Sequence, residues 1–225
     1  MSRVRPASGG GKTVEVIADR IRGWFARFTL RHQNVRRVEL STERLRVKTI
    51  DGATATAEIP FAPLLLAEPV HDLDTAIDIV LTHLALPRLV GLVLVRLGGH
   101  SIGIAQAGTV LVSTTDQLPV HGRNKAGGWS QQRFARRRAG QARVAVRHAA
   151  ADTRRVLGPR AGELSAVVLG GDLHMLTALR AEPGLAEIFA LAQPRVLDVP
   201  EPRRAVLDET ARRVLALEIL VREPG

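Results

Sequence analysis

The sequence predicts an α/β fold in which helices flank a mixed β-sheet, with an N-terminal elaboration made of a helix and a β-hairpin. Three features support this prediction. Apolar residues recur at helical spacing in some segments, they alternate with polar residues in others, and glycine-containing turns separate the alternating runs. The chain has 225 residues, of which 45% are hydrophobic, so it is long and apolar enough to bury a core of its own.

Residues 13–87 are predicted to form the N-terminal elaboration, after a flexible tail over residues 1–12 that is rich in glycine, serine and arginine. Apolar residues three and four apart predict helices, and Asp51-Gly52 between two alternating runs predicts a hairpin. The expected elements are an amphipathic helix over 14–28, a hairpin of Leu45–Ile50 and Ala53–Ile59, and a helix over 73–84.

Residues 88–225 are predicted to form the main domain, in which three short strands come first and helices then alternate with two more strands. The three strands are Leu89–Leu97, Ser101–Gln106 and Thr109–Ser113. The later elements are a long helix from Ser130 to Val156, a strand over Ala166–Leu169, a helix through Leu179, a short helix over Gly184–Ala192, a strand over Arg195–Val199 and a closing helix over Glu201–Val221.

Composition excludes several classes of function. The chain contains no cysteine, which rules out disulfide frameworks, cysteine zinc sites, iron–sulfur clusters and thiol catalysis. We interpret Asp72, Asp74 and Asp78 as a helix cap and a solvated helix face and not as a metal site. We also expect no cofactor. No apolar run is long enough to span a membrane, and residues 1–11 lack the apolar core of a secretory signal. We therefore expect a cytoplasmic location and no membrane partner.

The charge pattern indicates a polyanionic partner. The chain has 32 basic and 22 acidic residues and a formal net charge of +10. Codon bias toward arginine explains a general excess of arginine, but it does not explain why no acid occurs between Asp116 and Asp152. That segment contains Arg123, Lys125, Arg133, Arg136, Arg137, Arg138, Arg143 and Arg147. A local field of one sign is typical of proteins that bind nucleic acid.

A glycine-rich basic loop leads directly into the long helix. Gly127 and Gly128 allow this loop to approach another backbone closely, and the helix N-terminus that follows favours anions. Ser130 is the expected N-cap, which places Gln131 and Gln132 in the first turn. Four arginines share one narrow sector of the helix: Arg133, Arg136, Arg143 and Arg147. The segment contains no obvious general base, so its chemistry would depend on positioning and on hydrogen bonds.

This loop and helix resemble the middle domain of the archaeal and eukaryotic peptide-chain release factor. That domain carries a run of the form His-Gly-Arg-Gly-Gly-Gln-Ser-Ala-Leu-Arg-Phe-Ala-Arg-x-Arg. The matching residues here are His121-Gly122-Arg123, Gly127-Gly128 and Arg133-Phe134-Ala135-Arg136-x-Arg138, and Val167–Asp172 resembles that domain's strand-to-helix turn. The resemblance covers roughly residues 88–222 and implies an RNase H-like fold.

The chain departs from the release-factor pattern at one decisive position. Trp129 stands where the release factor has its catalytic glutamine, and three residues are inserted after Arg123. Instead, Gly128-Trp129-Ser130-Gln131 is similar to the glycine-x-x-glutamine motif of the release-factor-like Vms family, whose eukaryotic members work in ribosome-associated quality control. Without the cysteines and the length of those members, the chain resembles a stand-alone bacterial version. Nothing in it resembles a stop-codon-reading domain.

The resemblance implies a ribosome-associated peptidyl-tRNA hydrolase that releases nascent chains from stalled large ribosomal subunits. Gly127 and Gly128 would let the loop enter the peptidyl-transferase centre, and Gln131 would present its amide to the ester, with Gln132 as the alternate candidate. The residues expected to contact RNA are Arg123, Lys125, Trp129, Arg133, Arg136, Arg137, Arg138, Arg143 and Arg147. The implied partners are the large subunit with its ribosomal RNA, and peptidyl-tRNA, and no DNA is expected.

Two other readings of the same segment stay open. The eukaryotic relatives are associated with cutting tRNA near its 3′ CCA end, which is nuclease action. A module that binds RNA or the ribosome without catalysis is the second alternative, because a tryptophan stands at the glutamine position. Trp129 itself either stacks on a base or anchors the start of the helix.

Overall fold

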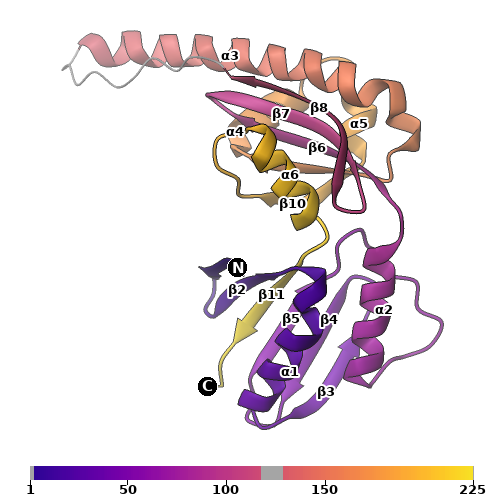
Figure 1. The fold of residues 1–225 in the computed structure, drawn as a ribbon. Helices are drawn as coiled ribbons and strands as arrows, with labels where there is room; N and C mark the ends of the chain where they lie inside the picture. The colour runs from indigo at the N-terminus through magenta and orange to yellow at the C-terminus, as the bar shows by residue number, and fades with distance from the viewer. Residues whose placement is uncertain (1–2, 118–128, 225) are drawn as a thin grey trace. The chain divides into compact units, whose positions relative to one another are not determined.

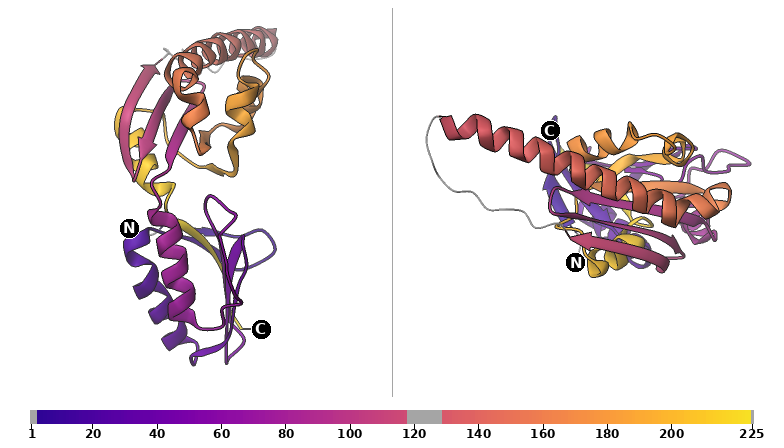
Figure 2. Two further views of the ribbon diagram at one scale, coloured as in Figure 1. Left: turned by 90° about the vertical axis from the view of Figure 1, so that its right-hand side faces the viewer. Right: turned by 90° about the horizontal axis from the view of Figure 1, so that it is seen from above.

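The computed structural model describes residues 3–117 and 129–224. The chain forms two compact units, one made of residues 1–86 and 212–225 and the other of residues 87–211 (Figure 1, Figure 2). Each unit has its own sheet and its own apolar core. The mixed α/β class with helix-flanked sheets is therefore confirmed.

The first unit is built on a six-stranded antiparallel sheet of order β1-β2-β11-β5-β4-β3. Its strands are β1 (Arg3–Pro6), β2 (Lys12–Val16), β3 (Val35–Leu40), β4 (Arg44–Thr49), β5 (Thr54–Glu58) and β11 (Leu217–Arg222). Its helices are η1 (Ala18–Arg20), α1 (Ile21–Arg31) and α2 (Leu73–Ala85). The two α-helices pack on one face of the sheet, where Phe25 and Ile77 join the buried strand residues in a single core.

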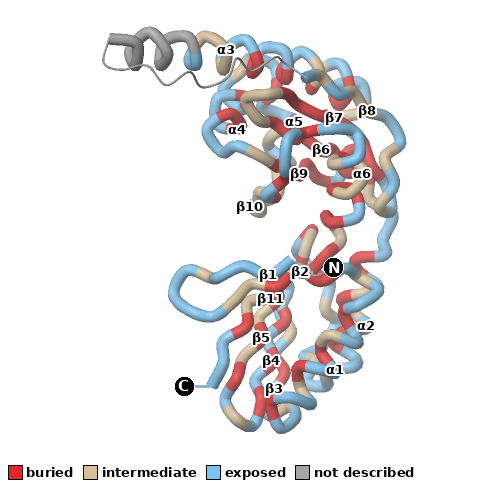
Figure 3. Tube along the Cα trace, turned by 60° about the vertical axis from the view of Figure 1, so that its left-hand side comes forward, coloured by how far each residue is buried: buried red, intermediate tan, exposed pale blue. Residues whose placement is uncertain are grey.

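Strand β4 shows why this sheet has one apolar and one polar face. Successive side chains of a strand point to opposite faces. Leu45 and Val47 are buried in the core, whereas Arg44, Arg46 and Lys48 are exposed on the other side. Figure 3 shows buried and exposed residues alternating along the strands of this unit.

The hairpin between β4 and β5 is held by one carboxylate. The Oδ1 atom of Asp51 accepts hydrogen bonds from the Thr49 hydroxyl (2.7 Å) and from the Ala53 N–H (3.0 Å), and its Oδ2 atom lies 2.8 Å from Nδ1 of His32. Gly52 completes the turn at a φ of +97°. Burial raises the pKa of Asp51, but the three hydrogen bonds together outweigh it and hold that pKa below its usual value.

The second unit is built on a five-stranded mixed sheet of order β10-β9-β6-β7-β8. Its strands are β6 (Leu89–Arg96), β7 (Gly99–Gln106), β8 (Thr109–Gln117), β9 (Ala166–Gly171) and β10 (Ala192–Leu197). The first three form an antiparallel meander, β9 runs parallel to β6, and β10 runs parallel to β9. Its helices are α3 (Trp129–Leu157), η2 (Gly158–Glu163), α4 (Leu173–Arg180), α5 (Ala186–Ala190) and α6 (Arg204–Arg213), whose last two residues belong to the first unit.

The helices of this unit lie on both faces of its sheet (Figure 1). On one face, α3 and α4 pack on β6, β7 and β9, with Ala149, Leu157 and Leu179 fully buried. On the other face, α6 lies so close to β7 that a Cβ at Gly103 would be 2.9 Å from the Leu207 side chain. A larger residue at position 103 would therefore push α6 away from the sheet.

The turn from β9 into α4 needs its glycine. Gly171 has a φ of +107°, and a Cβ there would collide with the carbonyl oxygen of Val95 in β6. Asp172 follows as the N-cap of α4, and its Oδ1 atom accepts hydrogen bonds from the backbone N–H groups of His174 (2.8 Å) and Met175 (3.1 Å). The Gly-Gly-Asp run thus serves to end a strand and start a helix within three residues.

Most of the expected elements are present. The hairpin, the helix beginning at residue 73, the three-strand meander, the long helix, the strand from Ala166 and the two helices that follow it are confirmed. The α3 helix begins at Trp129, so Ser130 lies inside its first turn and is not its N-cap.

The N-terminal predictions are wrong in two places. Residues 1–12 were expected to be a flexible tail, but Arg3–Pro6 forms β1 and Lys12 begins β2. The helix expected over 14–28 starts only at Ile21, because Val14 and Val16 are paired with β11. Local periodicity cannot predict the pairing of β2 with β11, since the two strands lie about two hundred residues apart in the sequence.

The C-terminal predictions also need correction. The closing helix expected over Glu201–Val221 is α6 followed by β11, and residues 212–225 belong to the first unit. Leu217, Ile219 and Val221 are buried in the core of that unit, and the residues between them are more exposed. Strand β10 begins at Ala192, three residues before the predicted start, and the edge strand β3 was not predicted at all.

Candidate functional site

The long helix α3 differs between its two ends in how it is supported. From Ala145 onward one face of the helix is buried against the sheet, with Val146, Ala149 and Leu157 in the core. A helix of 29 residues is about 43 Å long, whereas β8, the longest strand of this sheet, spans about 30 Å. The N-terminal part of α3 therefore projects past the sheet, as Figure 1 and Figure 2 show.

The structure describes the predicted site residues to different extents. Residues 118–128 lie outside the described residues, and with them Arg123, Lys125, Gly127 and Gly128. The helical backbone is described for the predicted residues of the first turns, but their side chains are not: Trp129, Gln131, Gln132, Arg133, Arg136 and Arg137. Arg138, Arg143 and Arg147 are described fully, and all three are exposed.

The helix brings the predicted basic positions together on one side. Because α3 is continuous, its period of 3.6 residues places positions 133, 136, 143 and 147 within one sector. They extend over about 21 Å along the helix axis, at about 1.5 Å a residue. Position 138 lies on another part of the helix surface. These four positions form a row along the helix that leads from the supported part of α3 toward its projecting end.

The arginines of this part of α3 whose side chains are described are not neutralised. Arg138, Arg143 and Arg147 form no ion pair with any residue in the described part of the chain. The acids on either side of the acid-free segment are engaged elsewhere. Asp116 in β8 lies 3.3 Å from Nδ1 of His148, and Asp152 is held by other partners. The exposed surface of α3 therefore keeps an unbalanced positive charge.

A buried histidine that the sequence did not single out fixes the supported half of α3. Nε2 of His100, in β7, lies 2.8 Å from Oδ2 of Asp152 in α3, and His100 is only 1% exposed. Arg155 donates to the other carboxylate oxygen of Asp152 at 2.6 Å. Burial raises the pKa of Asp152, but the hydrogen bonds from His100 and Arg155 outweigh it, so that pKa lies below its usual value. No local pattern reveals this pair, because 52 residues separate its members.

No metal centre or membrane span is found in the part of the chain that the structure describes. Within residues 3–117 and 129–224, histidine and acidic side chains nowhere gather in threes as a metal ion would require. Across the same ranges, every helix is too short or too polar to cross a bilayer. A row of arginines and a helix N-terminus are suited to binding phosphate groups.

Comparison with known proteins identifies the family. The sequence profile of the VLRF1 release factor of Actinobacteria and Chloroflexi matches residues 88–220. The chain belongs to this family. The match includes the 121–138 segment and the β9–α4 turn, so the expected membership of the release-factor-like Vms family is confirmed. The VLRF1 family is one of release factors, so membership indicates a role in translation.

Solved structures add only distant similarities. The crystal structure of the archaeal translation termination factor aRF1 is 14% identical with a TM-score of 0.40, and the similarity covers 72% of this chain and 47% of that one. A structure described as an archaeal protein is also 14% identical, with a TM-score of 0.33 and coverage of 73% and 48%. The chain thus spans about half the length of these proteins. No curated protein matches it significantly.

Proposed function

We propose that this VLRF1 family member is a ribosome-associated peptidyl-tRNA hydrolase that releases nascent chains from stalled large ribosomal subunits in the cytoplasm. The single observation that carries the proposal is the family match over residues 88–220, which contains the glycine pair and Gln131 at the start of α3. An RNase H-like fold for residues 88–211 is part of the same proposal. The proposal includes no cofactor.

The reaction is the hydrolysis of one ester. A water oxygen forms a bond to the carbonyl carbon of the peptide, and the bond from that carbon to the tRNA 3′ oxygen breaks. One proton of the water goes to the departing oxygen and the other is released to solvent. The products are a free peptide carboxylate and a tRNA with an intact 3′ end. In this proposal the amide of Gln131 orients the water or donates to the oxyanion, so the reaction needs no strongly basic side chain.

Each described feature of α3 supports a task in this proposal. The projecting end of the helix provides reach into a narrow site, and its N-terminus favours negative charge that develops near it. Arg138, Arg143 and Arg147 contribute exposed charges for the phosphates of ribosomal RNA or of the tRNA acceptor stem. Ala149 and Leu157 pack in the core and hold the C-terminal part of α3 against the sheet. The N-terminal end of the helix can therefore contact RNA while the rest of the helix stays in place.

The decisive experiment measures release from a defined substrate. Purified large subunits that carry a labelled peptidyl-tRNA are mixed with wild-type protein, Gln131→Ala or Gln132→Ala, and peptide, peptidyl-tRNA and tRNA 3′ ends are resolved on one gel. We expect the wild type to yield free peptide and intact tRNA. We expect Gln131→Ala to reduce the rate on the order of 10²–10³-fold while ribosome binding is kept, because a positioning donor is lost.

The same helix offers a matched control. Gln141 lies in α3 about 15 Å along the axis from Gln131, so Gln141→Ala removes an identical side chain away from the tip and should leave release unchanged. Release that survives in both the Gln131 and the Gln132 variants would contradict the assignment of the catalytic glutamine. The substrate itself is validated by puromycin, which must still discharge it.

Two other functions are tested on the same gel. A shortened tRNA 3′ end in place of an intact one would identify an endonuclease that cuts near the CCA end. Absence of both products on a puromycin-reactive substrate would identify a binding factor without catalysis, and Trp129 would then be its base-stacking candidate.

A further inference from the structure

The sheet of the first unit has an open face, on the side away from α1 and α2, and one end of this face is strongly basic. Outward-facing residues of β3, β4, β5 and β11 are aligned there by the strand register. We call this region the basic sheet face and define it by Arg37, Glu39, Arg46, Lys48, Thr54 and Arg222. It lies outside residues 88–220, which match the VLRF1 family.

The register brings the cations of three strands into one row. Arg37 in β3 is paired with Lys48 in β4, Lys48 is paired with Thr54 in β5, and Thr54 is paired with Arg222 in β11. Neighbouring strands are about 4.8 Å apart, and Arg46 lies about 6.8 Å from Lys48 along β4. Four cationic side chains and a hydroxyl thus share a patch only a few strands wide.

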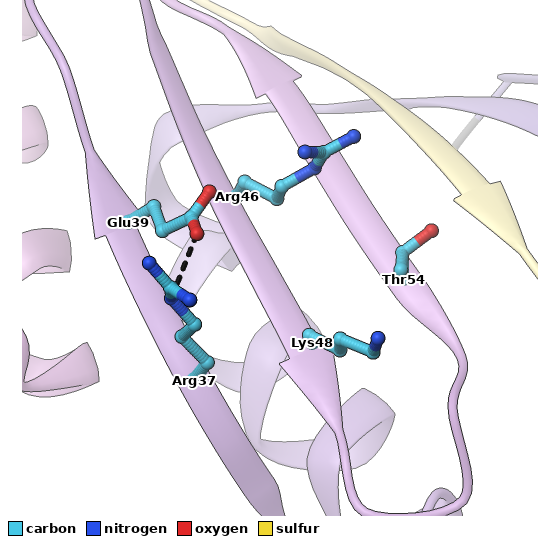
Figure 4. Close-up of a pocket in the computed structure, with 5 residues that line it drawn as sticks. All are labelled: Arg37, Glu39, Arg46, Lys48 and Thr54. Atoms are coloured by element: carbon cyan, nitrogen blue, oxygen red, sulfur yellow. Dashed lines mark ion pairs between the residues drawn. The ribbon is translucent and has the colours of Figure 1, made fainter.

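A shallow depression marks the centre of this patch. It has a volume of about 280 Å³ and is lined by Arg37, Glu39, Arg46, Lys48 and Thr54 (Figure 4). All five lining residues are polar, so the depression has no apolar pocket of the kind that anchors a peptide side chain.

The acids of the same face leave most of its cations without a partner. Each outward-facing glutamate on these strands and on β2 is held by an arginine: Glu39 by Arg37 at 2.8 Å, Glu58 by Arg44 at 3.8 Å, Glu218 by Arg5 at 2.6 Å and Glu15 by Arg213 at 2.7 Å. By contrast, Arg46, Lys48 and Arg222 form no ion pair with a described residue. Their charges are exposed and uncompensated.

We propose that the basic sheet face is a second RNA-binding surface, on which Arg46, Lys48 and Arg222 contact backbone phosphates and Thr54 donates a hydroxyl hydrogen bond. The face carries no aromatic residue on which a base could stack, so the contact is to the sugar-phosphate backbone and is independent of sequence. The absence of aromatic and apolar side chains from the patch also disfavours a membrane surface. The ribosomal partner of the proposed function supplies the source of this RNA.

Binding of RNA by the full chain tests this inference. A fluorescein-labelled single-stranded RNA of 20 nucleotides and mixed sequence is titrated with wild type and with Arg46→Gln/Lys48→Gln, and anisotropy is followed at several salt concentrations. We expect the double variant to bind on the order of tenfold more weakly at 50 mM salt. Its plot of log K against log salt should be less steep by about 1.4, since each phosphate contact on a single strand contributes about 0.7.

A control variant removes the same charge from the other side of the same unit. Arg20 and Arg27, in η1 and α1, are exposed and form no ion pair with a described residue, so Arg20→Gln/Arg27→Gln changes the net charge equally. We expect this variant to keep the wild-type affinity and slope. An equal loss in both variants, or a loss in neither, would overturn the proposal, as would binding to phosphatidylserine vesicles but not to the RNA.

A cross-linking measurement locates the contact directly. The same RNA with 4-thiouridine, irradiated with the full chain, should cross-link to peptides from residues 44–58. Cross-links confined to residues 118–157 would place all RNA binding on α3 and its loop and would contradict the proposal. The peptide-release assay tests the proposed hydrolase, whereas anisotropy and cross-linking test RNA binding by the basic sheet face. RNA binding at β4 can be measured whether or not the wild type hydrolyses peptidyl-tRNA, so failure of one hypothesis can be told from failure of the other.

Discussion

At the scale of single residues, the carboxylate of Asp152 links the helix that carries the candidate site to the sheet beneath it. It accepts a hydrogen bond from Arg155 in its own helix and faces the buried ring of His100 in β7. Burial of a carboxylate normally raises its pKa, yet these two partners hold the pKa of Asp152 below its usual value. The charged form of this residue therefore stabilises the docked half of α3.

This arrangement predicts a loss of stability in acid. The pKa of Asp152 is lower in the folded chain than in the unfolded one, where it is about 3.9. The contribution of Asp152 to the free energy of unfolding is therefore complete above about pH 4. It is lost as the pH falls through the lower pKa of the folded state. Asp152→Asn should reduce the stability of α3 and β7 at pH 7 by about 1–2 kcal/mol, because a charge-assisted hydrogen bond is lost.

Urea unfolding followed by hydrogen exchange in α3 and β7 peptides, from pH 7 to pH 3, measures this effect. The wild type should lose stability below pH 4 more steeply than Asp152→Asn. If the stability of the two proteins fell equally steeply with pH, Asp152 would not be the cause of the acid sensitivity.

At the scale of elements, α3 contains a glycine where its projecting part meets its packed part. Gly140 is half-buried, and a Cβ at this position would meet no atom within 4 Å outside the helix's own backbone. Glycine in a helix interior costs about 1 kcal/mol relative to alanine. The structure thus has room for alanine at position 140, close to the point where α3 leaves the sheet.

Gly140→Ala is expected to stabilise α3 by about 0.5–1 kcal/mol and to slow amide exchange around residue 140. Hydrogen exchange mass spectrometry measures the change. Gly91→Ala is expected to destabilise the packing of α3, because a Cβ at this position of β6 would lie 3.1 Å from the Leu157 side chain and crowd the core beneath the helix. Faster exchange in Gly140→Ala would mean that the glycine conformation is needed there.

At the scale of the whole molecule, the formal charge of +10 is unevenly distributed. Several acids elsewhere in the chain are paired with arginines, as Glu15 is with Arg213 at 2.7 Å, whereas Arg138, Arg143 and Arg147 of α3 have no such partners among the described residues. A field of one sign concentrated on one helix favours a polyanion and makes its binding sensitive to salt.

Neutralising the described part of this helix should weaken binding to large ribosomal subunits. Arg138→Gln/Arg143→Gln/Arg147→Gln is expected to lower the slope of log K against log salt by about 2, if each arginine contacts one phosphate. This slope is measured by sedimenting large subunits with bound protein at several salt concentrations. The control Arg20→Gln/Arg180→Gln/Arg212→Gln removes three other exposed arginines, and an equal change there would mean that only net charge matters.

The residues of the candidate site could be grouped from the sequence, whereas part of the fold could not be predicted from it. The glycine pair, Gln131 and the arginines of α3 are adjacent in sequence, so a motif and a helical period were enough to group them. The basic sheet face was not predicted, although Arg44, Arg46 and Lys48 alternate with apolar residues in the predicted hairpin. Its fourth cation, Arg222, comes from β11, of which Leu217–Val221 was predicted to be helical.

The sequence by itself determined what depends on neighbouring residues: the meander, the hairpin at Asp51-Gly52, the long basic helix and the release-factor motif at its start. Only the tertiary structure decided that Leu217–Arg222 is a strand between β2 and β5, and that His100 meets Asp152. The physical reason is that these segments gain most of their stability from partners far away along the chain. Burial of Leu217, Ile219 and Val221 between β2 and β5 outweighs the helical preference of the residues that lead into them.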